Sequence, residues 1–141
     1  MTRLKYILAS AALAICPLVS LKATEFKVVA NSSIGVGAVS PDDLKAVFLG
    51  TKTSLGDAGH VAPVLEKSGP AHEAFLKECV GRSDAALTNY YRSLVFTGKG
   101  SMPKTLGSDA EVIEYVAKTK GAIGYVGAGA AVAGAKTLEL K

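Results

Sequence analysis

Short apolar strands and clearly bounded helices alternate along the chain, and this alternation is the strongest constraint on its fold. The segment FKVVANSS (26–33) is a β-branched run that ends in polar turn residues, as is typical of a buried strand. A serine stands at the expected N-cap of three helices, at Ser40, Ser83 and Ser108. Further strands are expected at VAPVLE (61–66), AIGYV (122–126) and KTLEL (136–140). Helices that alternate with strands predict a single α/β domain.

Two helices carry the clearest boundary and packing signals. In the first, Pro41 suits the first helical position and Gly50 is placed for a left-handed C-terminal turn. A second helix opens at Ser68-Gly69-Pro70, and its apolar stripe places Cys79 four residues after Phe75. This position predicts that Cys79 is a core residue and not a nucleophile. The helix after Ser83 has an expected apolar side made of Leu87, Tyr90, Tyr91, Leu94 and Val95.

The first 23 residues have the pattern of a secretory signal peptide. Arg3 and Lys5 form a basic start, the run from Tyr6 to Leu21 is almost wholly apolar, and Ala23 is a small residue suited to a cleavage site. We therefore expect residues 24–141 to form one periplasmic domain. An uncleaved anchor is the alternative, although the apolar run is shorter than the ~20 residues of a spanning helix.

Charge and cysteine content narrow the function classes. The chain has 16 Lys and Arg residues against 12 Asp and Glu residues, and three of the basic ones (Arg3, Lys5 and Lys22) precede the expected cleavage site. The remainder is nearly neutral, so the clustered basic face of a nucleic-acid-binding protein is not expected. Cys79 is the one cysteine left after cleavage, which excludes a disulfide within the mature chain and leaves burial or pairing between chains.

The sequence patterns of common catalytic and metal sites are absent. No serine lies in a G-x-S-x-G sequence, and His60 and His72 are not part of an H-E-x-x-H sequence. His72 and Cys79 are near one helical face but two turns apart. The glycines of segment 127–134 do not have dinucleotide-binding spacing. We therefore expect no enzymatic activity, no metal and no cofactor.

The helix start at Ser68 and Gly69 is the one place with a physical case for ligand binding. Free backbone N–H groups, a serine hydroxyl and the positive end of the helix dipole together favour an anion. Lys67 directly precedes this turn and is the third candidate ligand residue. An ordinary helix start with proline in its first turn is the alternative.

The order of these segments resembles that of small secreted proteins related to the phosphate-binding subunit of ABC phosphate importers. These belong to the type II periplasmic binding protein class. The matching segments are SPDDLKAVFLG (40–50), VAPVLE with SGPAHEAFLKECVG (61–81), NYYRSLVFTGKGSMP (89–103) and GAIGYV (121–126). The resemblance implies an α/β domain like one lobe of such a protein, with a mixed sheet flanked by helices.

The resemblance also implies a function. In the phosphate-binding relatives, a Ser-Gly-Thr sequence after an arginine forms part of the phosphate cradle. Ser68 and Gly69 match this sequence, Pro70 replaces the threonine, and Glu66 and Lys67 occupy the region of the arginine. A non-enzymatic protein that binds phosphate or a similar small oxyanion weakly is therefore implied, with an ABC transporter permease as its partner. A homodimer would supply the second wall that a single lobe lacks.

A function of a different class stays open beside this one. A lobe that has lost its ligand would act as an interaction module, docking on a protein of the cell envelope or on a second copy. Such a module would show an apolar surface patch, which we expect along 123–133.

Overall fold

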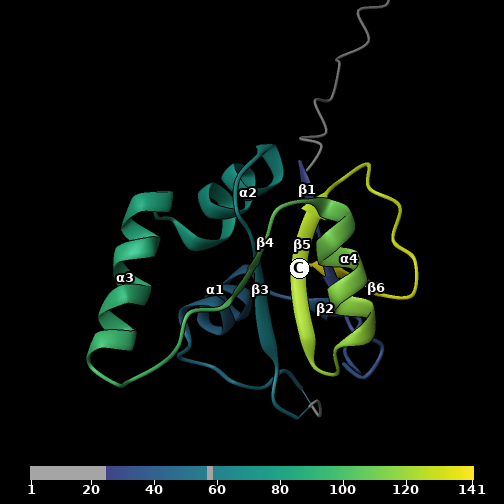
Figure 1. Cartoon of the computed structure of the whole chain (residues 1–141). Coiled ribbons are helices and arrows are strands. Elements are labelled where there is room, and N and C mark those ends of the chain that lie inside the picture. Colours follow the sequence, from purple (N-terminus) through teal and green to yellow (C-terminus); the bar gives the residue numbers. More distant parts are fainter. Residues whose placement is uncertain (1–24, 57–58) are drawn as a thin grey trace, which may run out of the picture.

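The computed structural model describes residues 25–56 and 59–141 (Figure 1), and the expected signal peptide lies outside them. The strands are β1 (Phe26–Ala30), β2 (Ala38–Val39), β3 (Ala62–Glu66), β4 (Lys104–Leu106), β5 (Ala122–Gly127) and β6 (Lys136–Leu140). The helices are α1 (Pro41–Leu49), α2 (Pro70–Phe75), the π-helical continuation η1 (Leu76–Val80), α3 (Asp84–Phe96) and α4 (Asp109–Lys118). In this part of the chain no helix is long and apolar enough to cross a membrane.

The strands form one mixed sheet in the order β2-β6-β1-β5-β3-β4. β1 runs antiparallel to both of its neighbours, β5 and β6, whereas β3 runs parallel to β5 and β4. The two edge strands, β2 and β4, are the shortest, so little unpaired backbone is presented at either edge. The predicted α/β domain with a mixed sheet flanked by helices is confirmed.

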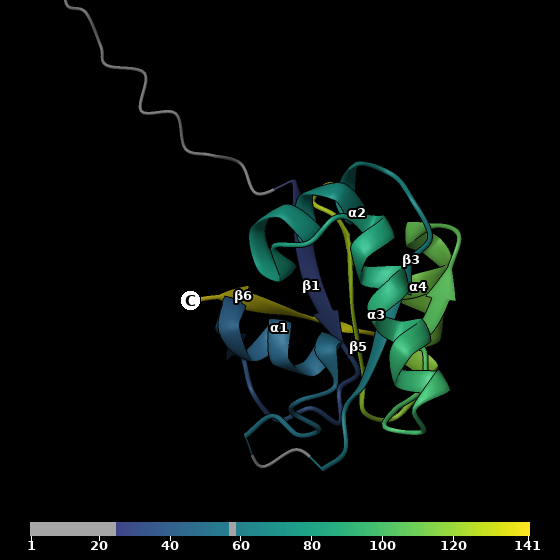
Figure 2. The same ribbon diagram turned by 90° about the vertical axis from the view of Figure 1, so that its left-hand side faces the viewer.

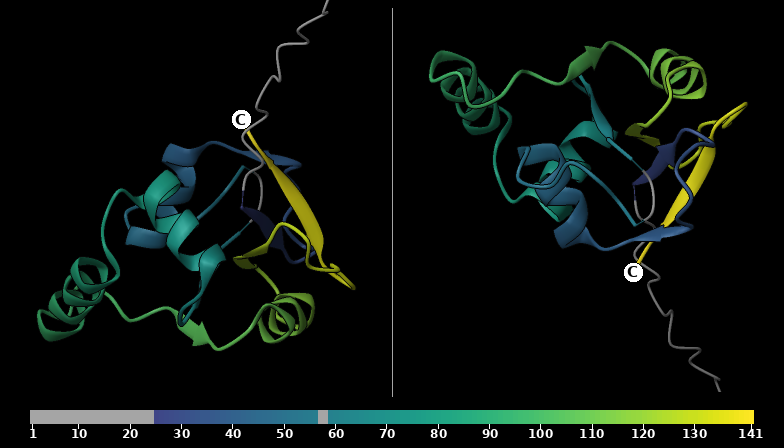
Figure 3. Two further views of the ribbon diagram at one scale, coloured as in Figure 1. Left: turned by 90° about the horizontal axis from the view of Figure 1, so that it is seen from above. Right: turned by 90° about the horizontal axis from the view of Figure 1, so that it is seen from below.

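Apolar side chains fill both faces of the sheet because residues alternate along each central strand. In β1, Val28 faces α1 and α2, whereas Val29 faces α4. β3 does the same with Leu65 and Val64. Figures 2 and 3 show α1 and α2 on one side of the sheet and α4 on the other. α3 lies farther out, beyond α1, and buries only Leu87 and Tyr91.

An aromatic cluster forms the centre of the α1–α2 face. The rings of Phe75 and Tyr125 stack with centroids 4.0 Å apart, and Phe48 contacts Phe75 edge-on at 4.7 Å. Phe26 adds a second edge-on contact with Phe75 at 5.7 Å. Aromatic pairs in these arrangements stabilise a core beyond the effect of their buried area.

The predicted helix starts are mostly confirmed. The side-chain oxygens of Ser40, Ser83 and Ser108 each accept a hydrogen bond from the backbone N–H three residues later. The expected left-handed turn at Gly50 is present, with φ at 79°. At α2, however, the N-cap is Gly69, and no side chain caps this helix.

The structure refines the expectations for the ends of β1 and α3. β1 spans Phe26–Ala30, and the polar residues 31–33 that were expected to end it form a turn, where the side-chain amide of Asn31 donates to Val116 O and Ala117 O at the end of α4. Val95 was expected on the buried side of α3, but it is 52% exposed. β2 and β4 were not predicted from the sequence.

The turn before β5 leads to a stability prediction. Gly121 has φ at 79°, and a Cβ built there would lie 2.4 Å from His60 O. Gly121→Ala should therefore lower the free energy of unfolding by about 2 kcal/mol or more, measured by urea denaturation. Gly35→Ala is the control, because its Cβ would meet no atom within 4 Å, and it should change stability by less than about 0.5 kcal/mol. Equal effects of the two substitutions would contradict this account.

Candidate functional site

The three candidate ligand residues lie together in the turn between β3 and α2. The N–H group of Lys67 donates to Leu106 O at 2.8 Å, which continues the pairing of β3 with β4. The side chains of Lys67 and Ser68 are exposed, and Gly69 is partly buried with φ at 113°. The turn is therefore a fixed, accessible element at the carboxyl end of β3.

The start of α2 offers a limited set of hydrogen-bond donors. Pro70 has no N–H group, and the N–H of Glu73 donates back to Gly69 O at 3.1 Å. The donors that remain at this helix start are the N–H groups of Ala71 and His72. An anion in the turn would meet these donors, the Ser68 hydroxyl and the Lys67 ammonium group.

Glu66 is a buried carboxyl group directly beside this turn, and sequence reasoning did not identify it as such. Its side chain is 5% exposed. Burial, followed by the neighbouring Asp109 carboxylate, raises the pKa of Glu66 from 4.5 to about 8. Glu66 is therefore mostly protonated at neutral pH, and it does not repel an anion in the adjacent turn.

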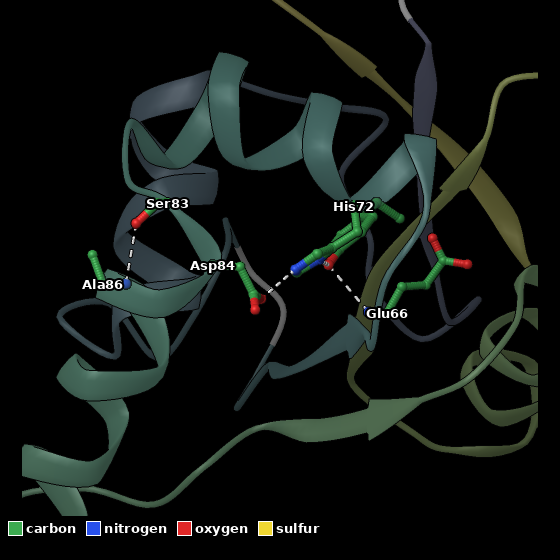
Figure 4. Close-up of polar contacts among 6 residues, drawn as sticks. Glu66, His72, Ser83, Asp84 and Ala86 are labelled. Atoms are coloured by element: carbon green, nitrogen blue, oxygen red, sulfur yellow. Dashed lines mark hydrogen bonds and ion pairs between the residues drawn. The ribbon is translucent and has the colours of Figure 1, made fainter.

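A series of hydrogen bonds links the end of β3 to β5, α2 and α3 (Figure 4). The Glu66 N–H donates to the Tyr125 hydroxyl oxygen at 3.1 Å, and that hydroxyl lies 2.5 Å from His72 Nδ1. His72 Nε2 lies 2.7 Å from Asp84 Oδ1 at the start of α3. We assign the His72 proton to Nε2, because the Tyr125 oxygen already accepts one bond and can donate its own proton to Nδ1.

These contacts decide the role of the two residues that could have formed a nucleophilic pair. His72 is occupied by Tyr125 and Asp84, and burial raises the pKa of Cys79 to about 11. The Cys79 thiol therefore stays protonated at neutral pH, and the prediction that Cys79 is a core residue is confirmed by its 7% exposure. Across residues 25–56 and 59–141, no group of three or more potential metal ligands is found.

Two cavities lie away from the Ser68 turn. One, of about 470 Å³, lies between the end of α1, α3 and the loop after α3, beside the first residues of β3. The other, of about 460 Å³, lies along β1 and β6. Ser68 and Gly69 line neither of them. Sequence reasoning took Tyr90 and Tyr91, which line the first cavity, as core residues only.

The two tyrosines explain why α3 stays close to α1 at this cavity. The Tyr90 hydroxyl donates to Leu49 O at 2.5 Å, and the Tyr91 hydroxyl donates to Phe48 O at 2.6 Å. Both acceptors are carbonyl groups in the last turn of α1, which have no partner within that helix. The sequence shows the adjacent aromatic pair, but it does not show which groups accept hydrogen bonds from the two hydroxyl groups.

Comparisons with known proteins support the fold. The chain has 14% identity and a TM-score of 0.61 with an ABC-type phosphate transport receptor from Vibrio cholerae. It has 15% identity and a TM-score of 0.63 with a putative phosphate ABC transporter substrate-binding protein, with bound phosphate, from Clostridium perfringens. PstS from Borrelia burgdorferi matches with 14% identity and a TM-score of 0.63. No protein-family model and no curated protein sequence matches the chain.

The extent of these matches defines the part of the fold that is shared. They cover 82–83% of this chain but only 44–47% of the three solved structures. The chain thus spans somewhat less than half the length of the proteins that it resembles. It has the fold of phosphate ABC transporter substrate-binding proteins over about half of their length, as a single lobe would.

The protonated state of Glu66 leads to a prediction about stability and pH. The folded protein keeps a proton on Glu66 between pH 4.5 and about 8, where the unfolded chain has released it. The native state binds more protons in this range, so the free energy of unfolding should fall as the pH rises. Ionisation of Glu66 should account for a decrease on the order of 2 to 4 kcal/mol in the free energy of unfolding over this range. This decrease should be absent from Glu66→Gln, whose side chain stays neutral.

The measurement is urea denaturation of both proteins at several pH values between about 5 and 8. Glu114→Gln is the control, because the hydrogen bond with Lys118 lowers the pKa of this exposed carboxyl group below the tested range. A Glu66→Gln variant with the same pH dependence as the unsubstituted protein would refute the assignment.

Proposed function

We propose that the chain is a periplasmic, non-enzymatic solute-binding protein of the phosphate-importer type, which binds phosphate or a similar small oxyanion weakly. The observation that carries this proposal is the exposed Lys67-Ser68-Gly69 turn at the start of α2, in a fold shared with phosphate-binding proteins. This turn combines a cation, a hydroxyl group and backbone N–H groups, which is the chemistry that favours an oxyanion.

The surroundings of the turn agree with this proposal. Glu66 is mostly neutral at pH 7, and the Asp109 carboxylate accepts a hydrogen bond from Gly127 N at 3.1 Å. Of these two adjacent carboxyl groups, Glu66 is therefore mostly without charge at pH 7, which lowers the negative charge close to the turn. Phosphate binding should weaken above about pH 8, where Glu66 ionises.

The affinity should be low, because the turn is open to water. A helix start contributes about 0.3–1 kcal/mol, and each hydrogen bond to a charged group adds about 1.5–3 kcal/mol. Two such bonds account for about 4 kcal/mol, which corresponds to a millimolar dissociation constant. Tighter binding would need a second wall that excludes water, such as another copy of the chain or an ABC transporter permease.

The test is isothermal titration of phosphate into the purified protein, with sulfate as the competing oxyanion. Ser68→Ala removes one hydrogen bond to the anion and should weaken phosphate binding roughly tenfold. Ser32→Ala is the matched control, because Ser32 is an exposed serine just after β1, at the opposite end of the sheet. A folded protein that gives no heat at millimolar phosphate would rule out the solute-binding proposal.

A specific observation also favours the second candidate function, an interaction module. The apolar patch that was expected along 123–133 is not found, because Ile123, Tyr125 and Val126 are fully buried. The exposed large apolar side chains of the described residues lie instead at the end of α3 and in the loop after it: Val95, Phe96 and Met102, with Phe96 94% exposed. In the second candidate function, a protein partner would cover this cluster of Val95, Phe96 and Met102.

Light scattering at increasing protein concentration tests the self-associating form of this module. If a second copy covers the cluster, Phe96→Ser should shift the protein toward the monomeric mass without lowering its stability. Phe75→Ser cannot serve for this test, because Phe75 lies in the core and its substitution would lower the stability of the fold. A protein that is monomeric at all concentrations, with and without the substitution, would exclude self-association through α3.

A further inference from the structure

The cavity beside α3 has the size and composition of a small-molecule binding site. Its volume of about 470 Å³ falls within the range of ordinary ligand pockets. It lies at the amino end of β3, whereas the Ser68 turn follows the carboxyl end of the same strand. The cavity is therefore a separate place from the proposed oxyanion site, and the proposed oxyanion binding does not use it.

The apolar part of the cavity combines aromatic and aliphatic side chains. Tyr90, Tyr91 and Tyr115 line it together with Leu94 and Met102. The hydroxyl groups of Tyr90 and Tyr91 are held by the end of α1, so their rings are fixed in place without a ligand. Rigid rings around a cavity favour a flat apolar group, since little side-chain freedom is lost when it binds.

The charged part of the cavity has one sign. Three lysines line it, Lys52, Lys99 and Lys104, and no carboxylate among the described residues does. Lys52 forms an ion pair with Asp43 at 2.9 Å. Lys99 and Lys104 form no ion pair within residues 25–56 and 59–141, and the Lys104 ammonium group lies 5.7 Å from the Tyr115 ring centroid. These two lysines are the cations that can accept an anionic partner.

We propose that this cavity binds a small amphipathic carboxylate, with a flat apolar body packed against Tyr90, Leu94 and Tyr115 and its carboxylate on Lys99 and Lys104. A phosphate ion has no apolar body and would gain little from the aromatic lining. A neutral apolar molecule would leave the lysine pair unused. The composition of the cavity thus selects for both properties in one ligand.

The test follows the backbone amide signals of the ¹⁵N-labelled protein by NMR during titration with indole-3-acetate, up to ~10 mM. Saturable shifts should appear at cavity residues with backbone N–H groups, such as Thr53, Gly100 and Ser101. Indole-3-acetamide, which has the same ring system without the charge, should bind roughly tenfold more weakly.

Substitutions separate the charge effect from a change in the fold. The double variant Lys99→Gln/Lys104→Gln should weaken indole-3-acetate roughly tenfold and leave indole-3-acetamide unchanged. Lys77→Gln/Lys120→Gln removes the same charge from exposed positions outside the cavity, and it should leave both titrations unchanged. Because all four lysines are exposed, the variants should keep the dispersed spectrum of the folded protein.

Three results would overturn the proposal. They are equal affinity for the acid and the amide, shifts confined to residues 67–71, and no saturable shift at ~10 mM. A parallel phosphate titration keeps the two sites distinguishable. Phosphate shifts at 67–71 without indole-3-acetate binding would refute only the cavity site, and the opposite result would refute only the oxyanion site.

Discussion

The position of the Ser68 turn depends on one buried side chain, Tyr125 in the centre of β5. Its ring stacks on Phe75 of α2, and its hydroxyl group accepts from the Glu66 N–H and contacts His72. Burial raises the pKa of Tyr125 above its usual range, so the hydroxyl keeps the proton that it shares with His72. One residue thereby fixes the end of β3, the start of α2 and, through His72, the start of α3.

The two proposed sites lie at opposite ends of β3, and this separation makes them independent. A strand of five residues spans about 17 Å, which is roughly twice the Debye length at physiological ionic strength. A charge bound at one end therefore has little direct effect at the other. The ends also differ in kind, because the Ser68 turn lies beside a carboxyl pair whereas the cavity has only lysines as charged groups.

Sequence reasoning succeeded where the determining contact is local. Ser40, Ser83 and Ser108 cap helices through bonds that span three residues, and Cys79 lies on the core stripe of its own helix. It also placed the three candidate ligand residues in one turn, because they are consecutive in the sequence. It could not give the burial of Glu66 beside Asp109, or the contacts of His72 with residues 12 and 53 positions away. The cavity could not be predicted from the sequence either, since the residues that line it extend from Val47 to Tyr115.

The position of β6 has a consequence for how this protein folds. β6 lies inside the sheet, between β2 and β1, although about a hundred residues separate it from both strands in the sequence. Among the described strands, β2 pairs only with β6, so the pairing of residues 38–39 requires β6 to be in place. The sheet therefore closes late, through contacts about a hundred residues apart, and such long-range pairing is slow. A partly folded chain in which β6 has not yet docked would expose the adjacent edge of β1, which makes this one pairing decisive for folding yield.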